Sequence, residues 1–132
     1  MQLTAIHALR VALLENHALN QAVSGQVYWD DAPAAATYPY VVISLNAGGA
    51  VNDAALRMAD LRYLVKAVGV NKTATVQIAD LIYQTLHEAD LVGDDSWYIW
   101  RCQQISMVSY SEMEAEVRYT HSGGIYRIRM SS

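Results

Sequence analysis

Residues that could do chemistry gather in the stretch YTHSGGIYRIRM, from Tyr119 to Met130. It holds a histidine, a serine, two adjacent glycines and two arginines. These residue types could belong to a hydrolytic site, to a phosphate-binding loop or to a strand that closes a fold. Each chemistry requires partners at a defined spacing elsewhere in the chain, and the sequence can be searched for them.

The histidines and the single cysteine are residue types that bind zinc. The histidines are His7, His17, His87 and His121, and neither an H-E-x-x-H nor a C-x-x-C pattern accompanies them. His7 and His17 are nearly three helical turns apart, which is too far for one ion to bind both. We therefore expect no metal site.

Cys102 would be the nucleophile of the simplest enzymatic site, with His87 or His121 as its base. The neighbouring Arg101 could lower the pKa of the thiol. However, Cys102 lies in an apolar run that is typical of a strand, and nothing around it resembles an oxyanion loop. A packed, unreactive thiol is favoured, and a small cysteine-dependent hydrolase remains the enzymatic alternative.

Paired carboxylates and paired glycines are equally uninformative about catalysis. Adjacent aspartates, as in Asp30–Asp31 and Asp94–Asp95, diverge from one another and usually mark turns. Gly48–Gly49 and Gly123–Gly124 lack the context of a nucleotide-binding loop. We expect the second glycine pair to mark a bulge or a close backbone approach in a long last strand. The sequence predicts no catalytic residues and no cofactor.

Charged residues on predicted strands are better candidates for docking on another protein. In SEMEAEVRY an extended backbone would place alternate charges on one face, with Met113, Ala115 and Val117 on the other. The candidates in this stretch are Glu112, Glu114, Glu116 and Arg118. A solvated hairpin and a docking arm both fit this pattern.

Two further strands present basic residues. In IYRIRM, Tyr126, Ile128 and Met130 should face the core, which leaves Arg127 and Arg129 pointing outward. The stretch ADLRYLVKAVGVN alternates in the same way and should expose Asp60, Arg62 and Lys66. Outward arginines protect strand edges, pair with carboxylates of a neighbour or face a nucleic-acid channel.

Composition narrows the class of protein. The chain has 132 residues, of which 53% are hydrophobic and 17% charged. This indicates a globular domain, and the shortage of charge is consistent with a surface covered by other subunits or with a thick core. A net charge of -4 argues against a sequence-independent nucleic-acid binder. One cysteine fits a reducing compartment, and we expect neither a signal peptide nor a membrane span.

Periodicity predicts an α+β domain with a single mainly antiparallel sheet flanked by two helices, over residues 1–132. The expected helices cover residues 3–20 and about 73–89, the second capped by Thr73 or Thr75. The expected strands cover about 26–29, 40–49, 59–71, 97–110 and 118–130. Between Trp100 and Ile105 the apolar side chains change from one face of the predicted strand to the other, which indicates a bulge.

Taken in order, these pieces resemble a known family. They are LTAIHALRVALLENHALN, GQVYWDDAPAAATYPYVVIS, LRYLVKAVGV, VQIADLIYQTLHEADL and HSGGIYRIRM. The chain resembles the small tail-terminator and tail-completion proteins of long-tailed bacteriophages, together with their relatives in prophages and gene transfer agents. The strand LRYLVKAVGV lacks the tryptophan common in that family, and WYIW is unusually aromatic, so terminator and neck or connector subunit both remain open.

The resemblance implies a sheet flanked by helices that assembles into a hexameric ring. Such a ring caps the tail tube of a siphophage, stops its polymerisation and presents a surface to the head–tail connector. Genome DNA passes through the lumen and makes only transient, non-specific contact. The implied location is the tail or neck of the virion, after assembly in the cytoplasm of the bacterial host. The family has no catalytic residues that could be transferred to this chain.

Overall fold

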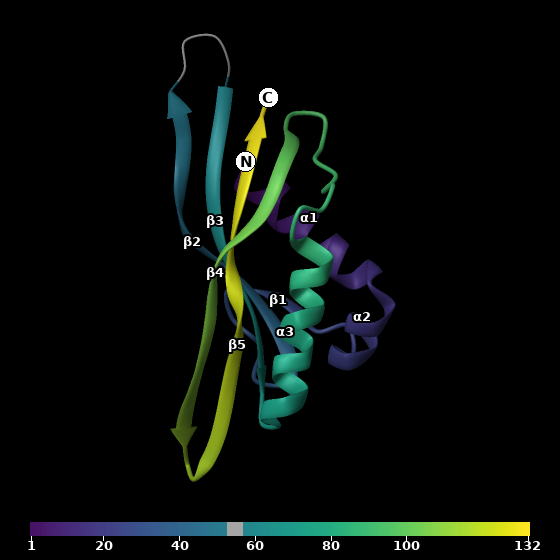
Figure 1. Cartoon of the computed structure of the whole chain (residues 1–132), viewed down its shortest axis with the longest axis vertical. Helices are drawn as coiled ribbons and strands as arrows, with labels where there is room; N and C mark the ends of the chain where they lie inside the picture. Colours follow the sequence, from purple (N-terminus) through teal and green to yellow (C-terminus); the bar gives the residue numbers. More distant parts are fainter. Residues whose placement is uncertain (53–56) are drawn as a thin grey trace.

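The computed structural model describes residues 1–52 and 57–132, and contains three helices and five strands within them. In chain order they are α1 (Gln2–Glu15), α2 (His17–Val23), β1 (Val27–Trp29), β2 (Tyr40–Asn52), β3 (Arg57–Gly69), α3 (Lys72–Leu86), β4 (Tyr98–Glu114) and β5 (Val117–Ser131). The strands form one sheet in the order β1-β2-β3-β5-β4 (Figure 1). Only β1 and β2 are parallel. The predicted α+β class with a mainly antiparallel sheet is confirmed.

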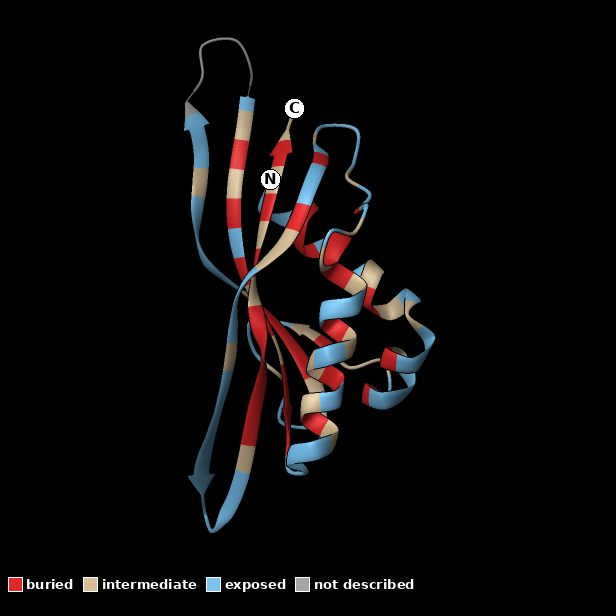
Figure 2. Ribbon diagram, in the orientation of Figure 1, coloured by how far each residue is buried: buried red, intermediate tan, exposed pale blue. Residues whose placement is uncertain are grey.

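The helices pack on one face of this sheet and leave the other face without helical cover (Figure 1). Alternate residues of β3 and β5 point into the helical side, where Leu61 and Ile128, and Tyr63 and Tyr126, are cross-strand partners. All four are buried, as are Leu9 and Leu13 of α1 and Ile82 of α3. Burial is concentrated on this side, whereas the far end of the β4–β5 hairpin is exposed (Figure 2).

The first helix was predicted as one element but is two. Asn16 adopts φ -74° and ψ 107°, which ends α1, and its side chain accepts a hydrogen bond from the backbone N–H of Leu19, which begins α2. Asparagine is among the best residues for this N-cap role. Its amide also donates to Thr85 Oγ1 on α3 at 2.8 Å, so the break is fixed by packing between helices.

The cap of the second predicted helix lies two residues before Thr73 and four before Thr75, the two proposed caps. Asn71 caps α3 by accepting from the N–H of Ala74 at 3.0 Å. Thr75 lies inside the helix, where its hydroxyl donates to the carbonyl of Asn71. None of the described helices is long and apolar enough to cross a membrane.

The β4–β5 hairpin departs from the prediction at its tip. Ala115 and Glu116 form a two-residue turn with φ values of 49° and 67°. Glu116 therefore does not continue the alternation of Glu112 and Glu114. Arg118 lies opposite Met113 in the register and so occupies the other face of the hairpin from the two glutamates. The prediction of one charged face through Arg118 is wrong, because the turn reverses the chain.

Two bulges and a close backbone contact shape the rest of β4 and β5. The β4 register shifts between Ile99 and Arg101 and again between Gln104 and Ser106, which confirms the predicted bulged strand. At Gly123 an added Cβ would lie 2.1 Å from the carbonyl oxygen of Val65 in β3. The predicted close approach is therefore confirmed.

A Gly123→Ala substitution should lower the free energy of unfolding by about 1–3 kcal/mol, because the added methyl group displaces the β3 backbone. Urea denaturation would measure the change. The matched control is Gly49→Ala in β2, since a Cβ there meets no atom within 4 Å. Equal stability of the two variants would contradict the role given to Gly123.

Candidate subunit interface

The open face is the side of the sheet without helices, and it collects most of the predicted interface residues. Because the side chains of a strand alternate, residues next to the buried ones of β3 and β5 lie on this face. The candidates found there are Arg62, Lys66, Arg127, Arg129, Glu112 and Glu114. Glu116 lies in the hairpin turn and Arg118 on the opposite side. Six of the eight residues therefore share one surface, which the sequence alone did not predict because it does not give the order of the strands.

Arg127 has a partner in its own chain. Its Nε lies 2.9 Å from Oδ1 and 3.1 Å from Oδ2 of Asp60, and its Nη2 also contacts Asp60. Asp60 is diagonal to Arg127 across the β3–β5 pair. Hydrogen bonding from Arg127 lowers the pKa of Asp60, and the charges of Arg127, Arg129 and Arg62 lower it further. The alternation of β3 predicts Asp60 on the outward side, but not its pairing with Arg127, because cross-strand register is not visible in the sequence.

Arg62 and Arg129 remain available for a partner at the same end of the face. Arg62 is exposed and lies directly opposite Arg127. Arg129 is half-buried, with its guanidinium 5.6 Å from the centre of the Trp100 ring. A hollow of about 250 Å³ lies beside these groups. It is lined by Val51, Met58, Ala59, Asp60, Trp100, Arg127 and Arg129.

His121 belongs to a cluster toward the hairpin end of the open face. Its Nε2 lies 2.6 Å from a carboxylate oxygen of Glu112, and its ring stacks on Tyr110 with centroids 4.5 Å apart. Lys66 Nζ donates to the Tyr110 hydroxyl at 2.8 Å. The histidine is therefore held by an acid and an aromatic ring on the sheet surface. Glu112 and Lys66, predicted separately as interface residues, meet in this cluster.

The apolar centre of the open face lies between the arginines and this cluster. Leu64 of β3 and Ile125 of β5 are cross-strand partners and are only half-buried. An apolar centre with charged groups on both sides is the usual arrangement of a protein–protein interface.

Glu114, Glu116 and Arg118 are exposed at the tip of the hairpin. Within the part of the chain that the structure describes, none of them forms an ion pair. The tip therefore presents carboxylates that a partner can reach.

The structure gives no support to Cys102 as a nucleophile. Its side chain is fully buried on the helical side of the sheet, opposite Ile128, and burial raises the pKa of its thiol to about 12. His121 lies on the other face, and His87 uses Nδ1 to accept from the N–H of Gln104. Neither histidine can act as its base in this arrangement.

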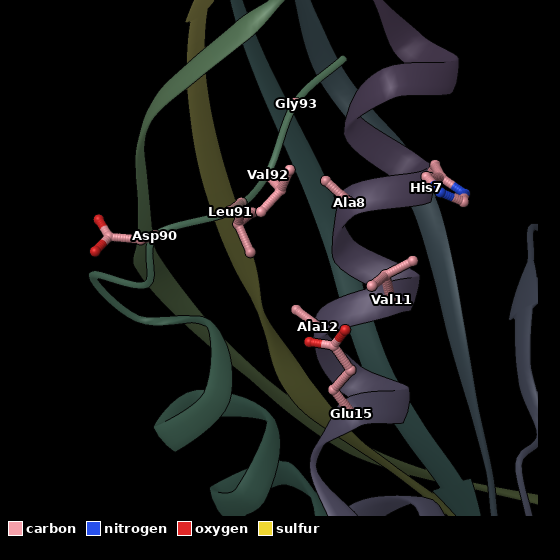
Figure 3. A pocket seen from close by; sticks show the side chains of 9 residues that line it. All are labelled: His7, Ala8, Val11, Ala12, Glu15, Asp90, Leu91, Val92 and Gly93. Carbon is pink, nitrogen blue, oxygen red and sulfur yellow. The ribbon is translucent and has the colours of Figure 1, made fainter.

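The helical side has a small pocket of about 170 Å³ between α1 and the segment of residues 90–93. Figure 3 shows that His7 and Asp90 point away from one another, with Leu91 and Val92 between them. Among the described residues there is no group of three or more histidine, cysteine or acidic side chains placed to hold a metal ion.

Comparison with known proteins identifies a family and several solved structures of similar fold. Residues 7–131 match the family described as tail completion protein gp17. A chain from a structure titled "Virion of native gene transfer agent (GTA) particle" has the same fold, with a TM-score of 0.76. The two sequences are 18% identical, and the match covers 96% of this chain and 94% of the other. No curated protein matches the sequence.

The Asp60–Arg127 pair should make stability depend on pH in a defined direction. The pKa of Asp60 is lower in the folded chain than in the unfolded one. The pair therefore stabilises the fold fully at pH values above the pKa of an unfolded aspartate, about 3.9. That stabilisation is lost as the pH falls through the lowered value. Asp60→Asn should therefore lower the urea midpoint at neutral pH, and the difference from wild type should shrink below about pH 4. The control is Asp95→Asn in an exposed turn, and a difference unchanged by pH would contradict the assignment.

Proposed function

The chain belongs to the tail completion protein gp17 family, and we propose that it forms a homo-oligomeric ring at the end of a phage-type tail. The family match over residues 7–131 carries this proposal, and it agrees with the resemblance found in the sequence. In this proposal residues 1–132 form one domain, which is the subunit of the ring. The ring has six copies, ends the tail tube and joins it to the head–tail connector.

The shape of the subunit supports a ring because it carries two different charged surfaces. The hairpin tip carries Glu114 and Glu116, and the opposite end of the open face carries Arg62 and Arg129. A head-to-tail interface requires two unlike, complementary surfaces, and it closes into a ring when its rotation angle allows. The acidic tip of one copy would dock on the arginines of the next.

The proposed partners are the tail tube protein on one side and connector proteins on the other. DNA would pass through the lumen with only transient contact, in keeping with the net charge of -4. A structural neighbour comes from a gene transfer agent particle, which supports a virion component. In this proposal the particle is assembled in the host cytoplasm. The alternative is a head–tail connector subunit, which would bind the portal side rather than the tube.

Deletion of this chain from a particle-producing host should yield heads and tubes that do not join, with tubes of uncontrolled length. Electron microscopy of the lysate would measure both, and the chain supplied in trans should restore joined particles. Joined particles with normal tails in its absence would reject the proposal. Tubes of normal length that fail to join would favour the connector alternative.

The charge contact between copies can be tested separately. Glu114→Lys combined with Glu116→Lys should weaken self-association without loss of the fold, because both side chains are exposed at the tip. Light scattering would give the mass, and circular dichroism would report the fold. The same change of charge in Asp31→Lys with Asp95→Lys, both in exposed loops, is the matched control. Equal weakening by the two double variants would show that only net charge matters.

A further inference from the structure

The sheet has an unpaired edge on each side. β4 is the last strand on one side, and its outer edge carries free backbone groups. On the other side β1 pairs with β2 only from Val41 to Ile43. The rest of β2, from Leu45 to Asn52, has no outer neighbour among the described residues (Figure 1).

The first half of β4 is covered, whereas the second half is free. The carbonyl of Cys102 accepts from the N–H of Glu88 at 2.8 Å, and the N–H of Gln104 donates to His87 Nδ1 at 3.0 Å. The segment after α3 thus occupies this part of the edge. Beyond the bulge at Ile105, residues from Ser106 to Glu114 have no such cover within the described part of the chain, and Met107 is 80% exposed.

The two free edges lack some of the features that normally keep sheets apart, although β2 has a bulge between Leu45 and Ala47 and β4 ends in Glu112 and Glu114. Monomeric proteins protect edge strands with lysine, proline or inward charges. β2 contains no charged residue and no proline, and β4 contains neither lysine nor proline. From Ser106 to Ser111 β4 is also uncharged. Its one arginine, Arg101, pairs with Glu88 at 3.0 Å. Within Ser106–Glu114, Glu112 already pairs with His121, and Glu114 is an exposed carboxylate at the end of the segment. Joining the two edges therefore buries no charge along the central part, from Ser106 to Ser111.

The directions of β2 and β4 allow the two strands to pair between copies. β2, β3, β5 and β4 are antiparallel to their successive neighbours, so β2 and β4 run in opposite directions. Leu45–Asn52 is level with the end of β5 and Ser106–Glu114 with its beginning, so the two segments lie at opposite ends of the sheet. When copies are related by rotation about an axis to which the strands are inclined, as in a closed barrel, β4 of one copy can meet β2 of the next as an antiparallel pair.

We propose that the Ser106–Glu114 edge of β4 pairs with the Leu45–Asn52 edge of β2 in a second copy, so that one sheet continues around the assembly. This rests on the proposed function, because it requires a head-to-tail ring. A two-fold arrangement would instead pair β4 with β4 and leave the uncharged β2 edge open. Pairing β4 with β2 satisfies both edges with one kind of contact.

Cysteine pairs can test the join, because partners on the same face of an antiparallel pair have Cβ atoms about 4.5–5.5 Å apart. Ala47→Cys or Val51→Cys in β2 is combined with Ser106→Cys or Val108→Cys in β4, all on the open face. Under mild oxidation, at least one of these pairs should lose the monomer band and form a disulfide-linked ladder on a denaturing gel. Cys102 stays in place because it is buried.

The controls distinguish a failure of the β2–β4 pairing from a failure of the ring to form. Each single-cysteine variant should stay unlinked, as should Gln21→Cys on α2 combined with the same β4 cysteines. An oligomer of full mass by light scattering without any β2–β4 linkage would overturn the strand pairing but not the ring. Linkage by a single β4 cysteine would show β4–β4 pairing and overturn the proposal. A monomer at every concentration would reject both the ring and the pairing.

Discussion

The pairing of β3 with β5 is the constraint on which the rest of the structure depends. Their register places Tyr63 beside Tyr126 and Leu61 beside Ile128 under the helices. Burying an aromatic side chain removes about 150–250 Å² from water, so these contacts strongly favour one register. A shift of one residue would turn every side chain of a strand to the other face. The same register therefore fixes which charges reach the open face.

The sequence predicted the helix-covered face well because that information is local. The alternation of apolar residues in β3 and β5 indicates which side chains are buried. Near Ile105 the apolar residues of β4 change face, which indicates a bulge, and the structure contains it. The sequence predicts a bulge or a close backbone approach at the Gly123–Gly124 pair, and the structure has the close approach, to β3 at Gly123. Each of these features is set by a single strand and its period.

What the sequence could not predict depends on contacts between distant segments or on unusual turns. Ala115 and Glu116 carry no signal for a turn with positive φ, which normally selects glycine or asparagine. Asp60 and Arg127 meet only through the β3–β5 register. The break at Asn16 lies in an amphipathic pattern that continues through it, and only the contact with Thr85 shows why the chain turns there.

These features suit the contact between copies of the chain that we propose. The helices cover one face of the sheet and bury its side chains. The open face has an apolar centre, with arginines at one end and the acidic hairpin tip at the other end. A native mass spectrum of the wild-type chain, alone and with tail tube protein, tests the central claim most directly. The account predicts a single closed oligomer, with six copies as the expected number. A strict monomer under both conditions would contradict it.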